Sequence, residues 1–256
     1  MGLTDKQKKE LDELLKSMFE AKLKAFKVKT GIDNSFAVAA VIPVKHRRIF
    51  STVHSWNTSF GQRFFERVAK FIANSSGHIA ETQWKAPVKI SSDRVTKINQ
   101  IVAEIGNYVK TKGKEGKPPD ADNEIKEILA IPNNNLVVDR NDNTVDVHFI
   151  KGQKEYCFDI KTAQPNQKGW IDLKKTTLKL SARLNKRVYA AVAAPYNPNS
   201  PKPYDAIGFQ YMQLGNDVFV GKDFWDLIGG KGCYEDLAAS FKRANGTKYF
   251  QKTLEK

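Results

Sequence analysis

Two runs of alternating apolar and polar residues flank a single glycine in the middle of the chain. The stretch reads VDVHFIKGQKEYCFDIKT, from Val145 to Thr162. Alternation with a period of two is typical of a strand with one buried face, and glycine at the first central position suits a type II′ turn. The pattern therefore predicts a β-hairpin that turns at Gly152 and Gln153.

This turn also fixes which residues face one another. It pairs Phe149 with Tyr156 and sets Asp146 directly opposite Asp159. Because side chains alternate between the two faces of a strand, one face is expected to be wholly apolar: Val145, Val147, Phe149, Tyr156, Phe158 and Ile160. The other face carries Asp146, His148, Glu155, Cys157, Asp159 and Lys161. A one-residue slip would set carboxylates against aromatic rings, so the register is well specified.

Apolar residues at helical spacing predict helices on both sides of the hairpin. The expected helices span 4–27, about 57–73, 93–110, 123–130, about 171–185 and about 234–244. Thr4 and Gln7 have the spacing of a capping box. The polar face of the first helix indicates a surface helix that packs on the domain or on a second subunit. Residues 35–50 are expected to form a short connecting region.

Short apolar runs predict two further strands, at 187–195 and around 217–220. The first is apolar on both faces, as in a strand buried on both sides. A proline-rich loop is expected at 195–204. The sequence shows no internal repeat, and no linker divides it into two cores. We therefore expect one domain over 1–256, with 1–30 as an N-terminal helical appendage. The alternation of helices and strands predicts the α/β class.

Length and cysteine content narrow the class of protein further. A chain of 256 residues can bury a core without disulfides, and its two cysteines, Cys157 and Cys233, have no neighbours at metal-ligand spacing. A zinc site is therefore not expected, and a reducing cytoplasm is the expected location. The charged start does not resemble a signal peptide, and no apolar run approaches the length of a membrane span.

The charge of the chain indicates a polyanionic partner. Forty-two Lys and Arg against 28 Asp and Glu give a net charge of +14, a surplus that favours nucleic acid. Half of it lies in residues 161–190, which hold eight basic residues and one acid, Asp172. On the helix after the hairpin, Lys175, Lys179, Arg183 and Lys186 lie opposite a leucine stripe. They suit either a surface that neutralises phosphates or an ordinary solvated lysine face.

The two facing aspartates require a cation, because like charges directly opposite on a sheet repel. Lys161 is one candidate, two residues beyond Asp159 on the same face. Mg²⁺ is another, since it takes carboxylate oxygens together with substrate phosphates, and the Ile160 carbonyl would add a ligand at the strand end. The alternative is a pair of exposed aspartates beside a lysine. The matched register and the basic segment favour an active site.

An acid on one strand, Asp-x-Lys on the next, then a helix and a strand resembles the PD-(D/E)xK nuclease core over about 57–195. Asp146 matches the first acid, and Asp159 and Lys161 match the second motif, although Val145 stands where the proline often occurs. FDIKTAQPN at 158–166, PYNP at 195–198 and VGKDFWDLIGG at 220–230 resemble type II restriction endonucleases, above all those that cut GG-N-CC palindromes. The resemblance implies a central mixed sheet flanked by helices.

The resemblance also implies a mechanism and partners. Mg²⁺ on Asp146 and Asp159 would activate water, Lys161 would orient or deprotonate it, and cleavage of double-stranded DNA would leave 5′-phosphates. Glu66 matches a helical glutamate of such enzymes, although a helical wheel places it opposite the phenylalanine stripe, as a solvated residue. A homodimer in a prokaryotic cytoplasm is implied, together with a DNA methyltransferase that acts on the same site without binding this chain.

Residues between the second motif and the following helix are candidates for contacts with DNA. They are Gln164, Asn166, Gln167 and Lys168, whose amides and ammonium group suit base edges and phosphates. The N-terminal helix and residues 223–230 are candidate dimer surfaces, although Phe224 and Trp225 equally suit a core. Two alternatives to a restriction enzyme stay open: a structure-specific or repair nuclease with the same core, and a non-catalytic DNA-binding protein.

Overall fold

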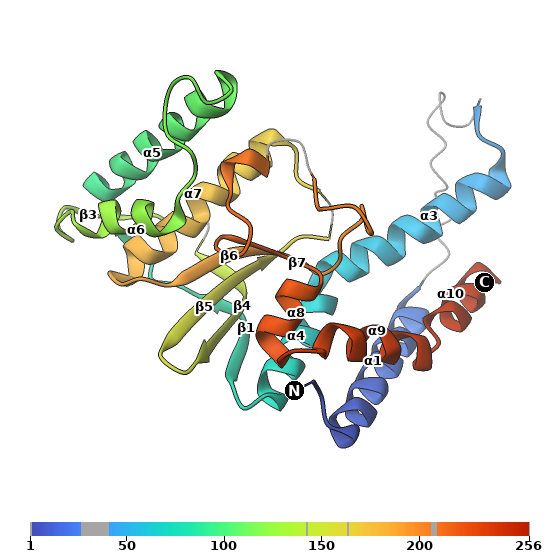
Figure 1. The fold of residues 1–256 in the computed structure, drawn as a ribbon. Coiled ribbons are helices and arrows are strands. Elements are labelled where there is room, and N and C mark those ends of the chain that lie inside the picture. Colours follow the sequence, from blue (N-terminus) through green and yellow to red (C-terminus); the bar gives the residue numbers. More distant parts are fainter. Residues whose placement is uncertain (1, 27–40, 142, 163, 206–208, 256) are drawn as a thin grey trace.

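A five-stranded mixed sheet forms the centre of the molecule (Figure 1). The computed structural model describes residues 2–26, 41–141, 143–162, 164–205 and 209–255. The sheet has the order β1-β4-β5-β6-β7, antiparallel from β1 to β5 and parallel from β5 to β7. Its strands are β1 (Ile79–Lys85), β4 (Thr144–Lys151), β5 (Lys154–Ile160), β6 (Tyr189–Ala194) and β7 (Val218–Val220). A separate antiparallel pair joins β2 (Lys89–Ser91) to β3 (Leu136–Val138).

Helices cover both faces of this sheet (Figure 1). One group comprises α1 (Asp5–Ala25), α4 (Phe65–Ser75), α8 (Lys222–Gly229), α9 (Cys233–Arg243) and α10 (Gly246–Leu254). The other comprises α5 (Ser92–Lys110), α6 (Ala121–Leu129) and α7 (Gln167–Leu184), with the 3₁₀ turn η2 (Phe209–Tyr211). Residues of β6 alternate between the two cores, which confirms a strand buried on both faces. The predicted α/β class with a restriction-endonuclease-like core is confirmed.

The predicted hairpin register is confirmed. Phe149 pairs with Tyr156, and the recorded ladder extends to Val147 opposite Phe158, so Asp146 and Asp159 occupy the next position. Gly152 has φ of +60°, as a type II′ turn requires. One part of the predicted face is wrong: Val145 packs with Cys157 and the residues under α7 rather than with Val147. Its ladder partner in β1, Trp84, packs against the same cluster.

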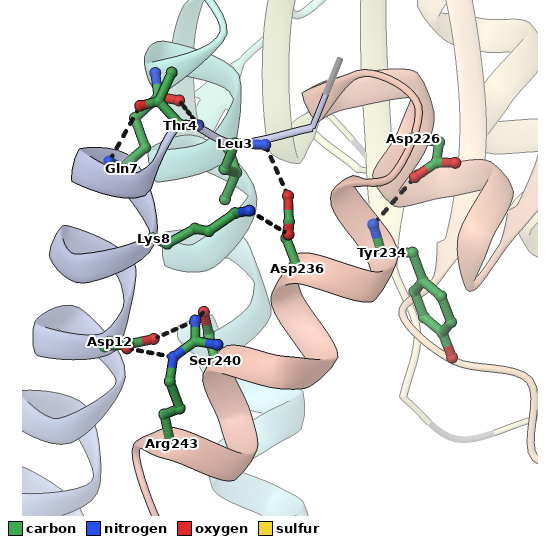
Figure 2. Close-up of polar contacts among 10 residues, drawn as sticks. All are labelled: Leu3, Thr4, Gln7, Lys8, Asp12, Asp226, Tyr234, Asp236, Ser240 and Arg243. Atoms are coloured by element: carbon green, nitrogen blue, oxygen red, sulfur yellow. Dashed lines mark hydrogen bonds and ion pairs between the residues drawn. The ribbon is translucent and has the colours of Figure 1, made fainter.

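The N-terminal helix is fastened to the domain by polar contacts as well as apolar ones (Figure 2). The predicted capping box of Thr4 and Gln7 is present. Lys8 contacts Asp236 at 2.9 Å, and Arg243 forms a bidentate pair with Asp12. The apolar side of α1, which is Leu11, Leu15, Met18 and Phe19, joins the same buried cluster as α4 and α8. Of the two alternatives for this helix, the structure shows packing on the domain.

Several elements differ from the sequence-based expectation. Residues 44–50 belong to α3 (Val44–Ser59), which continues through a π-helical segment, η1 (Phe60–Phe64), into α4; residues 35–40 of the expected connection lie outside the described residues. Strands β1 to β3 and helices α8 and α10 were not predicted. Phe224 and Trp225 are fully buried and belong to the core, whereas Asp223 is exposed, so a dimer surface at 223–230 stays a prediction. Among the described helices, none has the length and apolar character needed to cross a membrane.

Candidate active site

Asp146 lies where β4 and β5 separate. Beyond Val147 and Phe158 the recorded ladder stops, and the Asp146 carboxylate takes the place of a backbone acceptor: the Ile160 N–H donates to its Oδ2 at 2.8 Å. The next residue, Lys161, donates its N–H to the carbonyl of Ala193 in β6 at 2.9 Å. The end of β5 is thus held between a carboxylate and the neighbouring strand, which fixes where Asp146 stands relative to Asp159.

Asp159 and Lys161 contact each other on the polar side of β5. Lys161 Nζ lies 2.7 Å from Asp159 Oδ1. Burial raises the pKa of Asp159 to about 6; Lys161 acts against this shift, and the neighbouring Asp146 carboxylate adds to it. Burial is thus the main reason for the shift, and the attraction of Lys161 outweighs the repulsion from Asp146. The site holds two neighbouring carboxylates and one ammonium group, and carboxylate oxygens are ligands that a divalent cation takes.

Glu66 from α4 is part of the same cluster, although the helical wheel placed it in solvent. Glu66 is buried, with 6% of its surface exposed. The Gln83 side-chain amide of β1 donates to Glu66 Oε2 at 2.9 Å and to Asp146 Oδ1 at 3.2 Å. One amide group thus connects the carboxylate on the helix with the carboxylate on the strand. Three acidic side chains from three elements converge at one end of the β4–β5 pair.

The wheel placed Glu66 wrongly because it assumed a single buried face on this helix. Val68 and Glu66 lie on different sides of α4, and both are buried. Within α4, the buried positions are Phe65, Val68, Ala69 and Ile72, together with Glu66 and Ala73. Ala73 stands seven residues after Glu66 and therefore on the same side. A small residue on the same side of the helix as Glu66 was the sequence signal that could have indicated burial of this side.

Most of the basic segment after the hairpin is neutralised within the chain. Lys174 has no exposed side-chain surface and lies between Glu124 and Asp217. Arg183 is likewise enclosed; it donates to the carbonyls of Asp139 and Asn141 and pairs with the Asp139 carboxylate. The remaining pairs are Lys179 with Asp139, Lys186 with Glu155, and Arg187 with Asp122.

The prediction that these four basic side chains form an open stripe on α7 is therefore wrong. Arg183 faces inward, and the Lys179 side chain is 16% exposed beside its aspartate. Lys175 is half-buried against α5, and Lys186 is exposed but paired. Periodicity alone could not reveal this, because the acids that pair with the stripe, Asp139 and Glu155, come from the loop after β3 and from β5.

The polar residues at the start of α7 are at the surface, as expected. Asn166 is the N-cap and accepts from Gly169 N at 2.9 Å, and Gln164 donates to the carbonyl of Asp205. Gln167 and Lys168 occupy the first turn of α7 and are exposed. Of the eight predicted DNA contacts, these four lie on open surface directly after the strand that carries Asp159 and Lys161.

A cleft of about 830 Å³ opens beside the end of β5. Its wall includes Thr162, the residue after Lys161, and Tyr196, whose hydroxyl donates to the Thr162 carbonyl at 2.8 Å. The opposite wall is formed by α3 and η1. Polar side chains line that wall at helical spacing: His54, Asn57 and Thr58. Thr162 places this cleft next to the end of β5, although the carboxylates themselves are not among its lining residues. Sequence patterning did not reveal its polar helical face.

A second group on the hairpin has the composition of a metal site. Ligand atoms of His148, Glu155 and Cys157 lie within 4.8 Å of one another. Glu155 already accepts from His148 at 2.9 Å and contacts Lys186 at 2.5 Å, and burial raises the pKa of the Cys157 thiol. Since a metal needs the thiolate, these residues fit a hydrogen-bonded cluster better. His148, stacked on Trp84, is a packed histidine as expected.

Comparisons with known proteins point to one family. The family model described as "Type II restriction endonuclease, HinfI" matches residues 3–245. The type II restriction enzyme MjaII of Methanocaldococcus jannaschii is 25% identical over 227 residues, which is 82% of this chain and 56% of that protein. HgiBI and HgiEI, type II restriction enzymes of Herpetosiphon aurantiacus, are each 22% identical over 234 residues, 85% of this chain and 80% of theirs. This chain therefore spans about half the length of MjaII. No solved structure matches.

Proposed function

We propose, for a chain that belongs to the HinfI family of type II restriction endonucleases, that it cuts double-stranded DNA at a specific sequence in a Mg²⁺-dependent reaction. The sequence resembled type II restriction endonucleases, and that prediction is confirmed by the match over 3–245. Enzymes of this class are site-specific deoxyribonucleases. We propose in addition which metal the reaction needs, which ends the products carry and which residues take part in cleavage.

The convergence of Asp146, Asp159 and Glu66 beside Lys161 is the observation that carries this proposal. All three acids offer carboxylate oxygens, the ligands that Mg²⁺ prefers. Burial raises the pKa of Asp159, so the charged form of this carboxyl gains from a cation at the site. The donor set therefore fits a hard divalent cation, which we place on Asp146 and Asp159, with the Ile160 carbonyl as a third protein ligand.

Bound Mg²⁺ would polarise the scissile phosphate and lower the pKa of a water molecule. The protein side chains have separate tasks in this scheme. Lys161, held 2.7 Å from Asp159 in the free protein, would turn to the attacking water, orient it and stabilise the charge that develops on the phosphate. Glu66 would support the cluster from α4. In-line attack on phosphorus breaks the bond to the 3′ oxygen and leaves a 5′-phosphate.

We further propose that DNA lies along the cleft beside Thr162 and the exposed start of α7. The contacts that we expect are those of Gln164, Asn166, Gln167 and Lys168, which are open to a partner. Lys175 and Lys186 stay candidates at its margin. Lys179 and Arg183 are better explained as partners of Asp139.

The oligomeric state follows from the kind of site that we propose. A two-fold symmetric DNA sequence is matched by a two-fold symmetric protein, so we propose a homodimer. Helix α3 offers a surface for a second copy, since it exposes Val44, Ile49, Phe50 and Val53. A methyltransferase that protects the same sequence without binding this chain, and a prokaryotic cytoplasm, are parts of the same proposal.

Digestion of a sequenced plasmid in Mg²⁺, followed by mapping of the ends, tests the function. We expect discrete fragments with 5′-phosphates, cut within one short palindrome, and the resemblance predicts a sequence of the GG-N-CC kind. The Asp146→Ala and Lys161→Ala variants should retain DNA binding without cutting. Cleavage confined to branched or damaged DNA would instead support a repair nuclease, and wild-type protein that binds without any cleavage would support a DNA-binding protein.

A further inference from the structure

Gln83 stands out because its backbone is unusual for a strand residue. It lies near the end of β1 with φ of +55°, a left-handed conformation that costs a non-glycine residue about 1–2 kcal/mol. The residues on both sides keep their ladder partners: Thr82 pairs with Val147 and Trp84 with Val145. The strand is thus turned at one residue while the register of β1 against β4 is preserved.

The turn changes the face toward which Gln83 points. Ala80 packs in the cluster with α4, so regular alternation would place Gln83 on the opposite, α7 side of the sheet. Instead its amide reaches Glu66 on α4. Trp84 also departs from alternation: it packs in the cluster under α7 and stacks on His148 at 4.3 Å between ring centroids. The left-handed residue is therefore what directs the amide toward the carboxylates.

The amide group is chemically suited to join two acids. A side-chain amide nitrogen has two hydrogens, and here it lies 2.9 Å from Glu66 Oε2 and 3.2 Å from Asp146 Oδ1. Strained backbone persists where surrounding contacts hold it, and such residues cluster at functional sites. Groups that orient ligating carboxylates in this way typically change metal affinity or activity by about 10- to 100-fold when they are removed.

We propose that Gln83 is a positioning residue of the active site, which ties Glu66 to Asp146 and sets the separation of these carboxylates before metal and DNA bind. This inference rests on the proposed function of the same site. Gln83 acts through the two acids and does not itself take part in the reaction. Its left-handed backbone is the structural cost of bringing a donor from β1 to the α4 side.

Two substitutions separate this role from folding. Gln83→Gly removes the amide but suits the left-handed backbone, and Gln83→Glu keeps the length of the side chain while it replaces the donor with an acceptor. Asn135→Gly is the matched control, because Asn135 also has positive φ (+48°) and lies beside β3, away from the carboxylates. Three quantities are measured for each variant. They are the unfolding temperature, the single-turnover rate of plasmid cleavage at increasing enzyme concentration, and the affinity of DNA-free protein for Mg²⁺ by calorimetric titration.

We expect both Gln83 variants to lose about 100-fold in the plateau rate of cleavage, as misplacement of reacting groups by about 1 Å does. The half-saturating enzyme concentration should change less than about threefold, and Mg²⁺ should bind roughly tenfold more weakly. Gln83→Gly should unfold at the wild-type temperature or above, and Asn135→Gly should cut like wild type.

Wild-type plateau rates in Gln83→Gly would overturn the proposal. A loss of rate that is matched by a lower unfolding temperature in both variants would overturn it as well, since the amide would then only support the fold. Failure of the proposed function looks different: the wild-type protein itself would not cut, or Asp146→Ala would cut like wild type.

Discussion

The backbone N–H of Ile160 donates to the carboxylate of Asp146 at 2.8 Å, where the β4–β5 ladder ends. Asp146 therefore has a structural bond in addition to its expected role as a metal ligand. The two roles respond differently to substitution, because an amide can accept the same hydrogen bond but does not carry the charge.

Asp146→Asn and Asp146→Ala should be equally inactive but differ in stability. Both remove the carboxylate, so cleavage in Mg²⁺ should fall by at least about 10³-fold. Asparagine can still accept from Ile160, whereas alanine leaves a backbone donor without its partner, at a cost of about 1–3 kcal/mol. Urea denaturation and plasmid cleavage measure the two effects. Appreciable cleavage by either variant would contradict the assignment of Asp146.

Glu66→Gln should slow cleavage by about 10- to 100-fold without disturbing the fold. Glutamine preserves an oxygen that accepts from Gln83 but withdraws one negative charge from the cluster. Glu81→Gln is the matched control, since Glu81 is an exposed acid of the same strand as Gln83. Single-turnover rates distinguish them. Equal rates for Glu66→Gln and the control would show that the buried glutamate is a structural residue only.

Lys168→Ala should weaken DNA binding, whereas Lys179→Ala should not. Lys168 is exposed in the first turn of α7, and Lys179 is largely buried against Asp139. Loss of one phosphate contact lowers the dependence of log K on log salt by about 1. Fluorescence anisotropy with a labelled duplex at several salt concentrations gives both values. A reduced slope for Lys179→Ala would restore the basic stripe as a binding surface.

Lys174→Met should be strongly destabilising. Lys174 lies 2.5 Å from Glu124 and 2.6 Å from Asp217; burial lowers its pKa, but these two acids outweigh that effect and raise it, so the ammonium group is charged. Removing it leaves two buried acids uncompensated, which typically costs about 3–5 kcal/mol. Urea denaturation at pH 7 measures the change. Lys175→Met, at a half-buried neighbour, should stay within about 0.5 kcal/mol of wild type.

The pair between Asp12 and Arg243 should contribute little to stability despite its bidentate geometry (Figure 2). The Arg243 side chain is 46% exposed, and exposed pairs contribute about 0.2–1 kcal/mol. A double-mutant cycle with Asp12→Ala and Arg243→Ala should therefore give a coupling energy in that range. A coupling above about 2 kcal/mol would mean that polar contacts, rather than the apolar face of α1, hold this helix in place.

The β4–β5 hairpin could be predicted from sequence because local rules determine it. The turn at Gly152 and the alternation of the strands fix the pairing of Phe149 with Tyr156, and from there the positions of Asp146 and Asp159. Contacts within one supersecondary unit need no information about distant segments. The helices with strong apolar periodicity were located for the same reason. Their ends differ by a few residues, except that the helix expected from about 57 is continuous with α3 and begins at Val44.

The parts that were missed depend on contacts between distant segments. Nothing near Arg183 in sequence shows that Asp139 will enclose it, and a helical wheel that assumes one buried face cannot show that Glu66 is buried on a different side of α4. The left-handed backbone of Gln83 is equally invisible, because glutamine carries no preference for it. These three residues are where tertiary structure overrides local pattern, and two of them border the candidate active site.

The π-helical segment η1 separates two helical phases. Upstream, α3 directs His54, Asn57 and Thr58 into the cleft; downstream, α4 directs Glu66 at the carboxylates. A widened turn absorbs an extra residue locally, so either flank can keep its own orientation. We therefore expect that a substitution which reorients the cleft-lining face of α3 leaves Glu66 in place, so that the two proposed tasks of this long helix, contact with DNA and support of the carboxylates, can be altered separately.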